Sequence, residues 1–222
     1  MKDFSQRLLS SIKTWRWLLI LGGGVWLALM VLLHFQSAWP VGFLTRDPAA
    51  IAHHNPFFGA LSNIGILLWS ASAAVCGLSA AVLNIIQPIS DSRLFFGLFA
   101  GLSAALCLDD TFLLHEAILP NRLPLVHIPE AVVILSYVLV LIGAIVRFRK
   151  LLLDTSVWLF GLSLGCFAIA AGFDQILPPN VFSEDITFLI EDGFKLLAIF
   201  LWLAYFVRAS MESIVEAVEQ HA

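Results

Sequence analysis

Six long apolar segments, each about as long as a membrane is thick, constrain the fold more than any other feature of the sequence. They cover residues 16–36, 56–84, 94–118, 128–149, 156–177 and 184–208. A helix needs about 20 apolar residues to cross the hydrocarbon layer. Backbone polar groups in that layer must be bonded internally, which a helix achieves within its own segment. The sequence therefore predicts an all-α integral membrane protein, built as a bundle of six transmembrane helices.

The composition agrees with a chain whose surface faces lipid. Of its residues, 60% are hydrophobic and 13% are charged, and its mean hydropathy is +0.93. A soluble domain carries about 25% charged residues. The net charge of −4 gives no reason to expect nucleic acid as a partner. The three cysteines lie in apolar segments without a CxxC pair, so they indicate packing. The lipid bilayer is the partner that this composition predicts.

Lysine and arginine indicate which way the helices cross. With both termini in the cytoplasm, only Arg46 and Arg122 fall in outer loops, and Lys195 falls within the last span. Such a bias is the pattern of the positive-inside rule. We therefore expect an N-in, C-in protein of a cytoplasmic (inner) membrane of bacterial type. The cations on the cytoplasmic side are Lys2, Arg7, Lys13, Arg16, Arg93, Arg147, Arg149, Lys150 and Arg208.

No linker divides the chain, so the sequence predicts one membrane domain with two short cytoplasmic extensions. The predicted parts are an amphipathic segment at 1–15, a six-helix domain at 16–209 and a tail at 210–222. The first apolar segment exceeds the roughly 7–15 residues of a signal-peptide core, which favours a membrane anchor. Asn55 and Pro56 are a capping residue and a first-turn proline, and they predict the start of the second span.

Ionisable residues inside the predicted spans need a physical explanation, because they are costly in a membrane and usually functional. The third span contains Asp109 and Asp110, and the sixth contains Glu191, Asp192 and Lys195. From a rise of 1.5 Å per residue, all four carboxylates lie about 13 Å below the outer ends of their helices. The same arithmetic places an amide in the second span, Asn63, about 11 Å deep. These groups therefore share one layer of the outer half.

A second polar layer is predicted nearer the outer surface. Its members near the third span are His115 and Glu116, and other spans or loops contribute His127, Glu130, Asp174, Glu184 and Asp185. His54 is expected at or beyond the outer ends of the first two spans. On a continuous helix, residues seven apart differ by only about 20° in direction. Asp109 and Glu116 would then lie on one stripe of the third span. Each helix is thus expected to present an acidic corner to its neighbours.

Charge balance leads from this acidic layer to a metal hypothesis. Glu191 and Lys195 stand four apart in the favourable order for an ion pair, which neutralises one acid. Three ionised acids without partners would cost several kcal/mol each, so they need protons, water or a cation. A protonated network bonded to Asn63 and Lys195 is the structural alternative.

The sequence predicts one or two divalent or transition metal ions at this acidic layer. The predicted ligands are Asp109, Asp110, His115, Glu116, Glu191 and Asp192, supported by Asn63, Glu130, Asp174 and His54.

The function that this pattern favours is a metal-dependent membrane enzyme, of hydrolase or oxidoreductase type, acting on a lipid or other amphipathic substrate. The predicted catalytic residues are Asp109, Asp110, Glu191, Asp192 and Lys195, in a site toward the outer face. One alternative is a transporter or channel for protons or divalent cations that uses the same acids. The nearly charge-free inner halves of the spans count against a transport path. A second alternative is a non-catalytic subunit that binds a partner or pigment.

Overall fold

Every element that the computed structural model describes is helical. The described residues are 20–46, 48–121, 127–175 and 184–220, and no β-strand occurs among them. Contacts divide the chain into two units, Met1–Phe58 and Gly59–Ala222. In the first unit, the helix Ile20–Phe35 is followed by α2 (Val41–Thr45) and α3 (Pro48–Ile51). The predicted helical fold is therefore confirmed for the described ranges.

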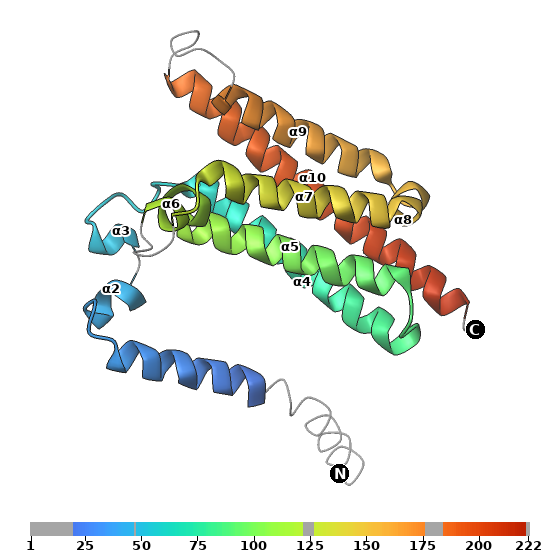
Figure 1. Ribbon diagram of the computed structural model, residues 1–222, viewed down its shortest axis with the longest axis horizontal. Helices are drawn as coiled ribbons and strands as arrows, with labels where there is room; N and C mark the ends of the chain where they lie inside the picture. The colour runs from blue at the N-terminus through green and yellow to red at the C-terminus, as the bar shows by residue number, and fades with distance from the viewer. Residues whose placement is uncertain (1–19, 47, 122–126, 176–183, 221–222) are drawn as a thin grey trace. The chain divides into compact units, whose positions relative to one another are not determined.

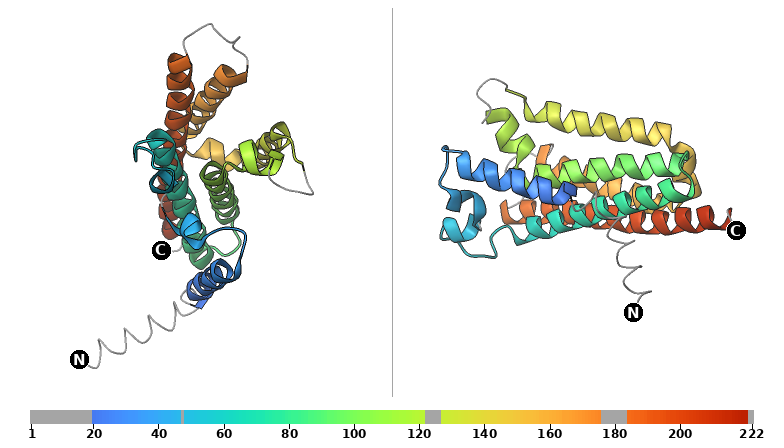
Figure 2. Two further views of the ribbon diagram at one scale, coloured as in Figure 1. Left: turned by 90° about the vertical axis from the view of Figure 1, so that its left-hand side faces the viewer. Right: turned by 90° about the horizontal axis from the view of Figure 1, so that it is seen from below.

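The second unit is built from long helices joined by short elements, and Figures 1 and 2 show the long helices running roughly along one direction. Helix α4 packs against both α5 and α10, and α9 packs against α10. The long helices are α4 (Ala60–Ile86), α5 (Asp91–Phe112), α7 (Glu130–Arg147), α9 (Val157–Gln175) and α10 (Glu184–Glu219). The short elements are η1 (Leu114–Ile118), α6 (Leu119–Asn121) and α8 (Arg149–Asp154).

Three of these helices, α4, α5 and α7, are long and apolar enough to cross a membrane. The stretches Ile20–Phe35 and Val157–Gly172 are shorter apolar helices. Large apolar side chains on the long helices are exposed, including Leu67 of α4 and Val146 of α7. Helices that expose apolar side chains along their length are suited to lipid, because water would disfavour so large an apolar surface. The chain therefore has the character of a membrane protein.

A cluster of aromatic side chains forms the centre of the second unit. Ring centroids of Phe99 and Phe206 lie 4.8 Å apart, and those of Trp202 and Phe206 lie 5.2 Å apart. Aromatic pairs favour separations of about 4.5–7 Å. The cluster joins four helices, because its members come from α4, α5, α9 and α10. These members are Trp69, Phe95, Phe96, Phe99, Phe160, Trp202, Tyr205 and Phe206.

Hydrogen bonds between helices fix how α10 lies against its neighbours. The indole Nε1 of Trp202 donates to Ser103 Oγ of α5 at 3.1 Å. The hydroxyl of Ser163 on α9 donates to the carbonyl oxygen of Ala198 at 2.8 Å. Each such bond between membrane helices contributes about 0.6 kcal/mol on average. Gly65 also allows a close approach of α4 to α10, because a Cβ there would lie 3.3 Å from Ile199 Cδ1 and the Ile199 side chain would have to shift by a few tenths of an ångström.

Several helix boundaries differ from the predicted ones. Helix α4 begins at Ala60, because the Asn55 side chain accepts a hydrogen bond from Phe57 N in a preceding turn. Helix α10 runs unbroken to Glu219, since Ala209, Ser210 and Met211 include no helix breaker. The third predicted span, 94–118, is wrong at its outer end, because α5 stops at Phe112.

Candidate functional site

The termination of α5 at Phe112, earlier than predicted, shapes the candidate site. Leu113 has φ 51°, in the left-handed region that costs a residue with a side chain about 1–2 kcal/mol. Its backbone N–H still donates to the carbonyl oxygen of Asp109. The chain then forms the π-helical turn η1, in which Ile118 N donates to Leu113 O at 3.1 Å. This turn folds the segment after α5 back toward the last turn of α5.

The folded-back turn brings His115 onto Asp109. The Asp109 side chain is buried, and its Oδ1 accepts the backbone N–H of His115 at 2.9 Å. Its Oδ2 lies 2.5 Å from His115 Nδ1. The other ring nitrogen, Nε2, lies 3.5 Å from Glu116 Oε1. A carboxylate bonded to one ring nitrogen fixes the orientation of the imidazole and leaves the other nitrogen for chemistry.

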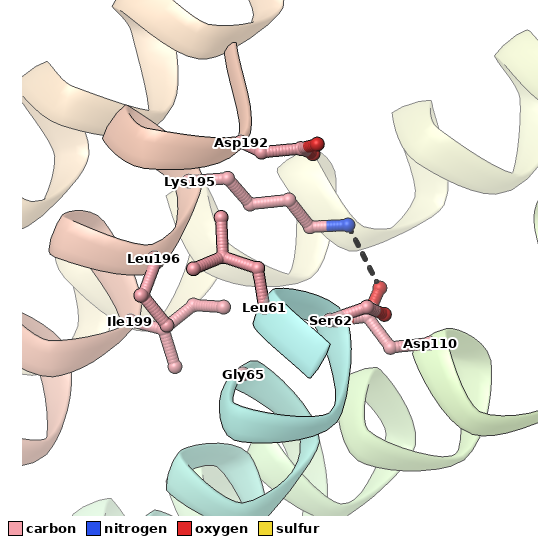
Figure 3. Close-up of a pocket in the computed structure, with 8 residues that line it drawn as sticks. All are labelled: Leu61, Ser62, Gly65, Asp110, Asp192, Lys195, Leu196 and Ile199. Carbon is pink, nitrogen blue, oxygen red and sulfur yellow. Dashed lines mark hydrogen bonds and ion pairs between the residues drawn. The ribbon is translucent and has the colours of Figure 1, made fainter. Parts of the chain in front are cut away.

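The neighbouring carboxylate, Asp110, faces other helices. Its Oδ1 lies 3.1 Å from the Nζ of Lys195 on α10, as Figure 3 shows. Its Oδ2 accepts a hydrogen bond from Trp69 Nε1 of α4 at 3.1 Å. Consecutive residues on a helix point about 100° apart, so Asp109 and Asp110 serve different partners. Asp110 thereby links α4, α5 and α10.

A small pocket opens beside the Lys195 ammonium group. In Figure 3 the side chains of Asp192 and Lys195 leave α10 in the same direction. The pocket has a volume of about 40 Å³, and a water molecule needs only about 10–15 Å³ measured this way. It therefore holds a few waters or one small polar group. Its lining residues are Leu61, Ser62, Gly65, Asp110, Asp192, Lys195, Leu196 and Ile199.

The two acid–base pairs lie within electrostatic range of each other. The charge of Lys195 acts on His115, and the charge of Glu116 acts on Lys195. Tyr137 of α7 lies close enough to both Asp109 and Asp110 for an electrostatic interaction with each carboxyl group. The sequence analysis missed Trp69, Tyr137 and Ser62 as parts of this site. A single tryptophan, tyrosine or serine in an apolar helix is most often a packing residue, so the sequence offered no stronger signal.

The comparison with known protein families assigns the chain to one group. A family model described as a domain of unknown function, DUF8692, matches residues 9–209, which is most of the chain. The chain belongs to the DUF8692 family. No curated protein and no solved structure matches it. The function of this DUF8692 protein must therefore be argued from its own site.

The structure places the predicted ligands of the DUF8692 chain in two sets rather than one. Asp109 lies with His115 and Glu116, whereas Asp110 and Asp192 lie at the Lys195 pocket. Within the described ranges, no group of three or more His, Cys, Asp and Glu residues is arranged to hold a metal ion. The predicted stripe of Asp109 and Glu116 on one continuous helix is wrong, because the turn at Leu113 interrupts it.

The ion pair that Lys195 forms also differs from the pair that the sequence favoured. The ammonium group pairs with Asp110 of α5, whereas the sequence analysis paired it with Glu191 and gave a bond from Lys195 to the acidic layer only as the structural alternative. Glu191 is half-buried on α10, one position before Asp192. The Glu191–Lys195 pair stays a prediction. Because His115 and Lys195 supply partners to Asp109 and Asp110, fewer acids need an outside cation than the sequence implied.

None of the predicted supporting residues is among the described lining residues of the Lys195 pocket. Asn63 is exposed on α4 and is not a lining residue, whereas Ser62 beside it is. Glu130 is exposed in the first turn of α7. The side chain of Asp174 lies outside the described residues. His54 belongs to the first unit, where its ring packs on Phe58.

Replacing Lys195 by methionine in the DUF8692 protein is expected to cost about 1 kcal/mol, because Asp110 loses a partner that is itself partly exposed. In the Lys195→Met background, Asp110→Asn is expected to cost less than it does alone, with a coupling energy of about 0.5–3 kcal/mol. Unfolding of the four proteins in mixed detergent micelles measures this cycle. Strict additivity of the two changes would contradict the ion pair.

Proposed function

We propose that this DUF8692 protein is a membrane-embedded enzyme that uses an oriented histidine, His115, to transfer protons at a lipid or other amphipathic substrate. The observation that carries the proposal is the buried carboxylate of Asp109 at 2.5 Å from His115 Nδ1. With the proton on Nδ1, Nε2 is a proton acceptor, as in enzymes that pair a histidine with a carboxylate. Proton transfer of this kind favours hydrolase chemistry over oxidoreductase chemistry.

A metal ion is the alternative to proton transfer at His115, because Nε2 cannot bind an ion and accept a proton together, and its set of ligands is narrower than the sequence predicted. Two ligands bound at 2.0–2.1 Å to a tetrahedral ion lie about 3.3 Å apart. The 3.5 Å between His115 Nε2 and Glu116 Oε1 is compatible with that separation. Asp109 would then orient His115 instead of binding the ion directly. A bound ion would supply an activated water for hydrolysis.

In the reaction without a bound ion, Nε2 of His115 accepts a proton from water as the hydroxide adds to the substrate carbonyl. The same proton then passes to the leaving group, which returns the imidazole to its starting state. Lys195 would face a negative group of the substrate while Asp110 holds its ammonium in place. The small polar pocket lies beside Leu61, Leu196 and Ile199, which supports a substrate with one polar end and one apolar part.

The proposed setting is a six-span, N-in and C-in protein of a bacterial inner membrane, with the site toward the outer face. Support comes from lysines and arginines, which concentrate on one side of the predicted topology. Helix length supports it further. Helix α10 has 36 residues and α9 has 19, and about 20 suffice to cross the hydrocarbon layer.

The test is conversion of lipids by purified protein in nanodiscs that contain a total bacterial lipid extract, followed by mass spectrometry. We expect His115→Ala to lower the conversion rate at least about 100-fold, the contribution of a proton-transfer group. His127→Ala is the matched control, because that exposed histidine bonds to the carbonyl oxygen of Pro120. Equal activity of the two variants, or no conversion by the wild type, would refute the enzyme proposal.

Metal content is measured on the same preparations. We expect Glu116→Ala to abolish stoichiometric metal, whereas Asp109→Asn should weaken metal affinity about 10–100-fold, the effect of removing a group that orients a ligand. Conversion that depends on His115 but persists in chelated, metal-free protein would remove the metal from the proposal and leave the proton-transfer role intact. The two experiments therefore test the histidine and the ion separately.

Proton or cation transport is the second candidate, and one observation favours it. Buried hydroxyl groups continue from the site toward the other end of the second unit, including Ser103, Ser79 and Ser210. The Oγ atoms of Ser79 and Ser210 lie 2.5 Å apart. Hydroxyl groups that bond to one another between helices are suited to a proton path. Proteoliposome flux that is abolished by Asp110→Asn, without lipid conversion, would favour transport over the enzyme.

A further inference from the structure

A second opening lies between α4 and α5, far along both helices from the acidic site. This groove has a volume of about 580 Å³, within the range of small-molecule sites. Small residues leave the space open. Ala80 and Ala81 line it from α4. Gly97 lines it from α5, and a Cβ built on Gly97 would meet no heavy atom of the described chain within 4 Å.

The groove is apolar along its length and cationic at its end. Leu94 and Leu98 continue its apolar wall along α5. Arg93 stands at the start of α5, where its Nη1 donates to Asn84 Oδ1 at 2.9 Å. The Nε of Arg93 is buried and has no hydrogen-bond partner among the described residues. A buried donor without an acceptor is unfavourable, so this guanidinium group favours an added acceptor.

More cations surround the same end. A neighbouring pocket, which shares Phe148 with the groove, is lined by Asp91, Arg147, Arg149 and Lys150. Arg147 is neutralised by Asp91, whose Oδ1 lies 2.6 Å from Nη2. Arg93 of the groove and Arg149 and Lys150 of the neighbouring pocket are the other cations in the two linings. A ligand with an anionic head and an apolar chain matches both of its parts.

We infer that the α4–α5 groove binds an anionic phospholipid, with its phosphate at Arg93 and one acyl chain along Gly97 and Ala80. Basic residues between membrane helices at the cytoplasmic side are typical contacts of anionic lipid head groups. Under the proposed topology, this end of α5 faces the cytoplasm. The lipid at this groove is distinct from any substrate at His115, and the inference does not depend on the enzyme proposal.

Native mass spectrometry of detergent-purified protein tests the site with two probes, phosphatidylglycerol and phosphatidylcholine with identical acyl chains. The wild type is expected to retain phosphatidylglycerol about 10-fold better, and Arg93→Gln is expected to remove that preference. Gly97→Leu adds an apolar side chain at a position where a Cβ meets no described heavy atom within 4 Å, and it is expected to reduce binding of both lipids.

The chain offers a matched control for each variant. Arg208→Gln removes a cation of α10 that pairs with Glu212 at 2.8 Å. Gly161→Leu adds the same side chain at a position of α9 that is equally open. Both controls should retain phosphatidylglycerol like the wild type.

Equal retention of the two lipids by the wild type would overturn the inference. Unchanged retention of phosphatidylglycerol by both single variants, Arg93→Gln and Gly97→Leu, would also overturn it. A surface for another protein helix would then be the alternative role of the groove. Circular dichroism and thermal unfolding establish that each variant is folded. If Arg93→Gln fails to fold, the result for Gly97→Leu against Gly161→Leu decides the question alone.

Discussion

Replacing Asp109 by alanine is expected to lower the free energy of unfolding by about 3–5 kcal/mol, the cost of removing one partner of a buried polar pair. The change leaves the backbone N–H of His115 and its ring Nδ1 without their acceptor beside a turn that is already strained. Asp109→Asn keeps one acceptor oxygen and should cost about half as much, because the hydrogen bond to a charged group is lost.

Unfolding by sodium dodecyl sulfate in mixed micelles, followed by tryptophan fluorescence, measures these differences. Asp154→Ala is the control, because Asp154 is exposed at the end of α8 and should change stability by no more than about 0.5 kcal/mol. A loss below about 1 kcal/mol for Asp109→Ala would show that the turn after α5 does not depend on the Asp109–His115 contact, against the argument from geometry.

The second large effect is expected at Trp202, whose replacement by alanine should cost about 3–5 kcal/mol. Its indole ring contacts Trp69, Phe99 and Phe160, so its loss leaves a cavity where three other helices meet α10. It also leaves Ser103 without its hydrogen-bond donor. Because lipid tails are as apolar as the core, the loss reflects packing more than transfer of apolar surface from water.

Trp158→Ala removes the same side chain from the surface of α9, where 60% of the residue is exposed. Its cost should not exceed about 0.5 kcal/mol. The same detergent titration compares the two variants. Similar losses at Trp158 and Trp202 would contradict the description of the aromatic cluster as the centre of the second unit.

Helix positions were predictable because long apolar segments leave the backbone few choices in lipid. Errors arose where polar residues stand at helix ends. Helix α5 begins at Asp91, three residues before the predicted start, because Ser90 Oγ accepts a hydrogen bond from Arg93 N. This serine cap satisfies a donor that the apolar pattern does not reveal. Conversely, Asn55 precedes α4 without starting it, since Gly59 is the residue at its N-cap.

Candidate residues of the site were predictable in kind but not in arrangement. The cost of charges inside a membrane singled out Asp109, Asp110 and Lys195, and the structure gives each a bonded partner. The arrangement depends on the left-handed conformation of Leu113. No glycine, proline or asparagine stands between Thr111 and His115, so the sequence contains no ordinary signal for that turn. Contacts between helices, such as Trp69 to Asp110, have no signal in sequence spacing.

The turn at Leu113 has a consequence for how the site responds when helices move. Asp109 and His115 are only six residues apart and are joined by a single hydrogen-bonded turn. Their geometry is therefore local and moves with the C-terminal end of α5 as one preassembled piece. Lys195 reaches Asp110 from another helix, so tilting or sliding of α10 would change that second contact first. Rearrangement of the bundle would thus reposition the ammonium relative to the imidazole while the histidine kept its alignment.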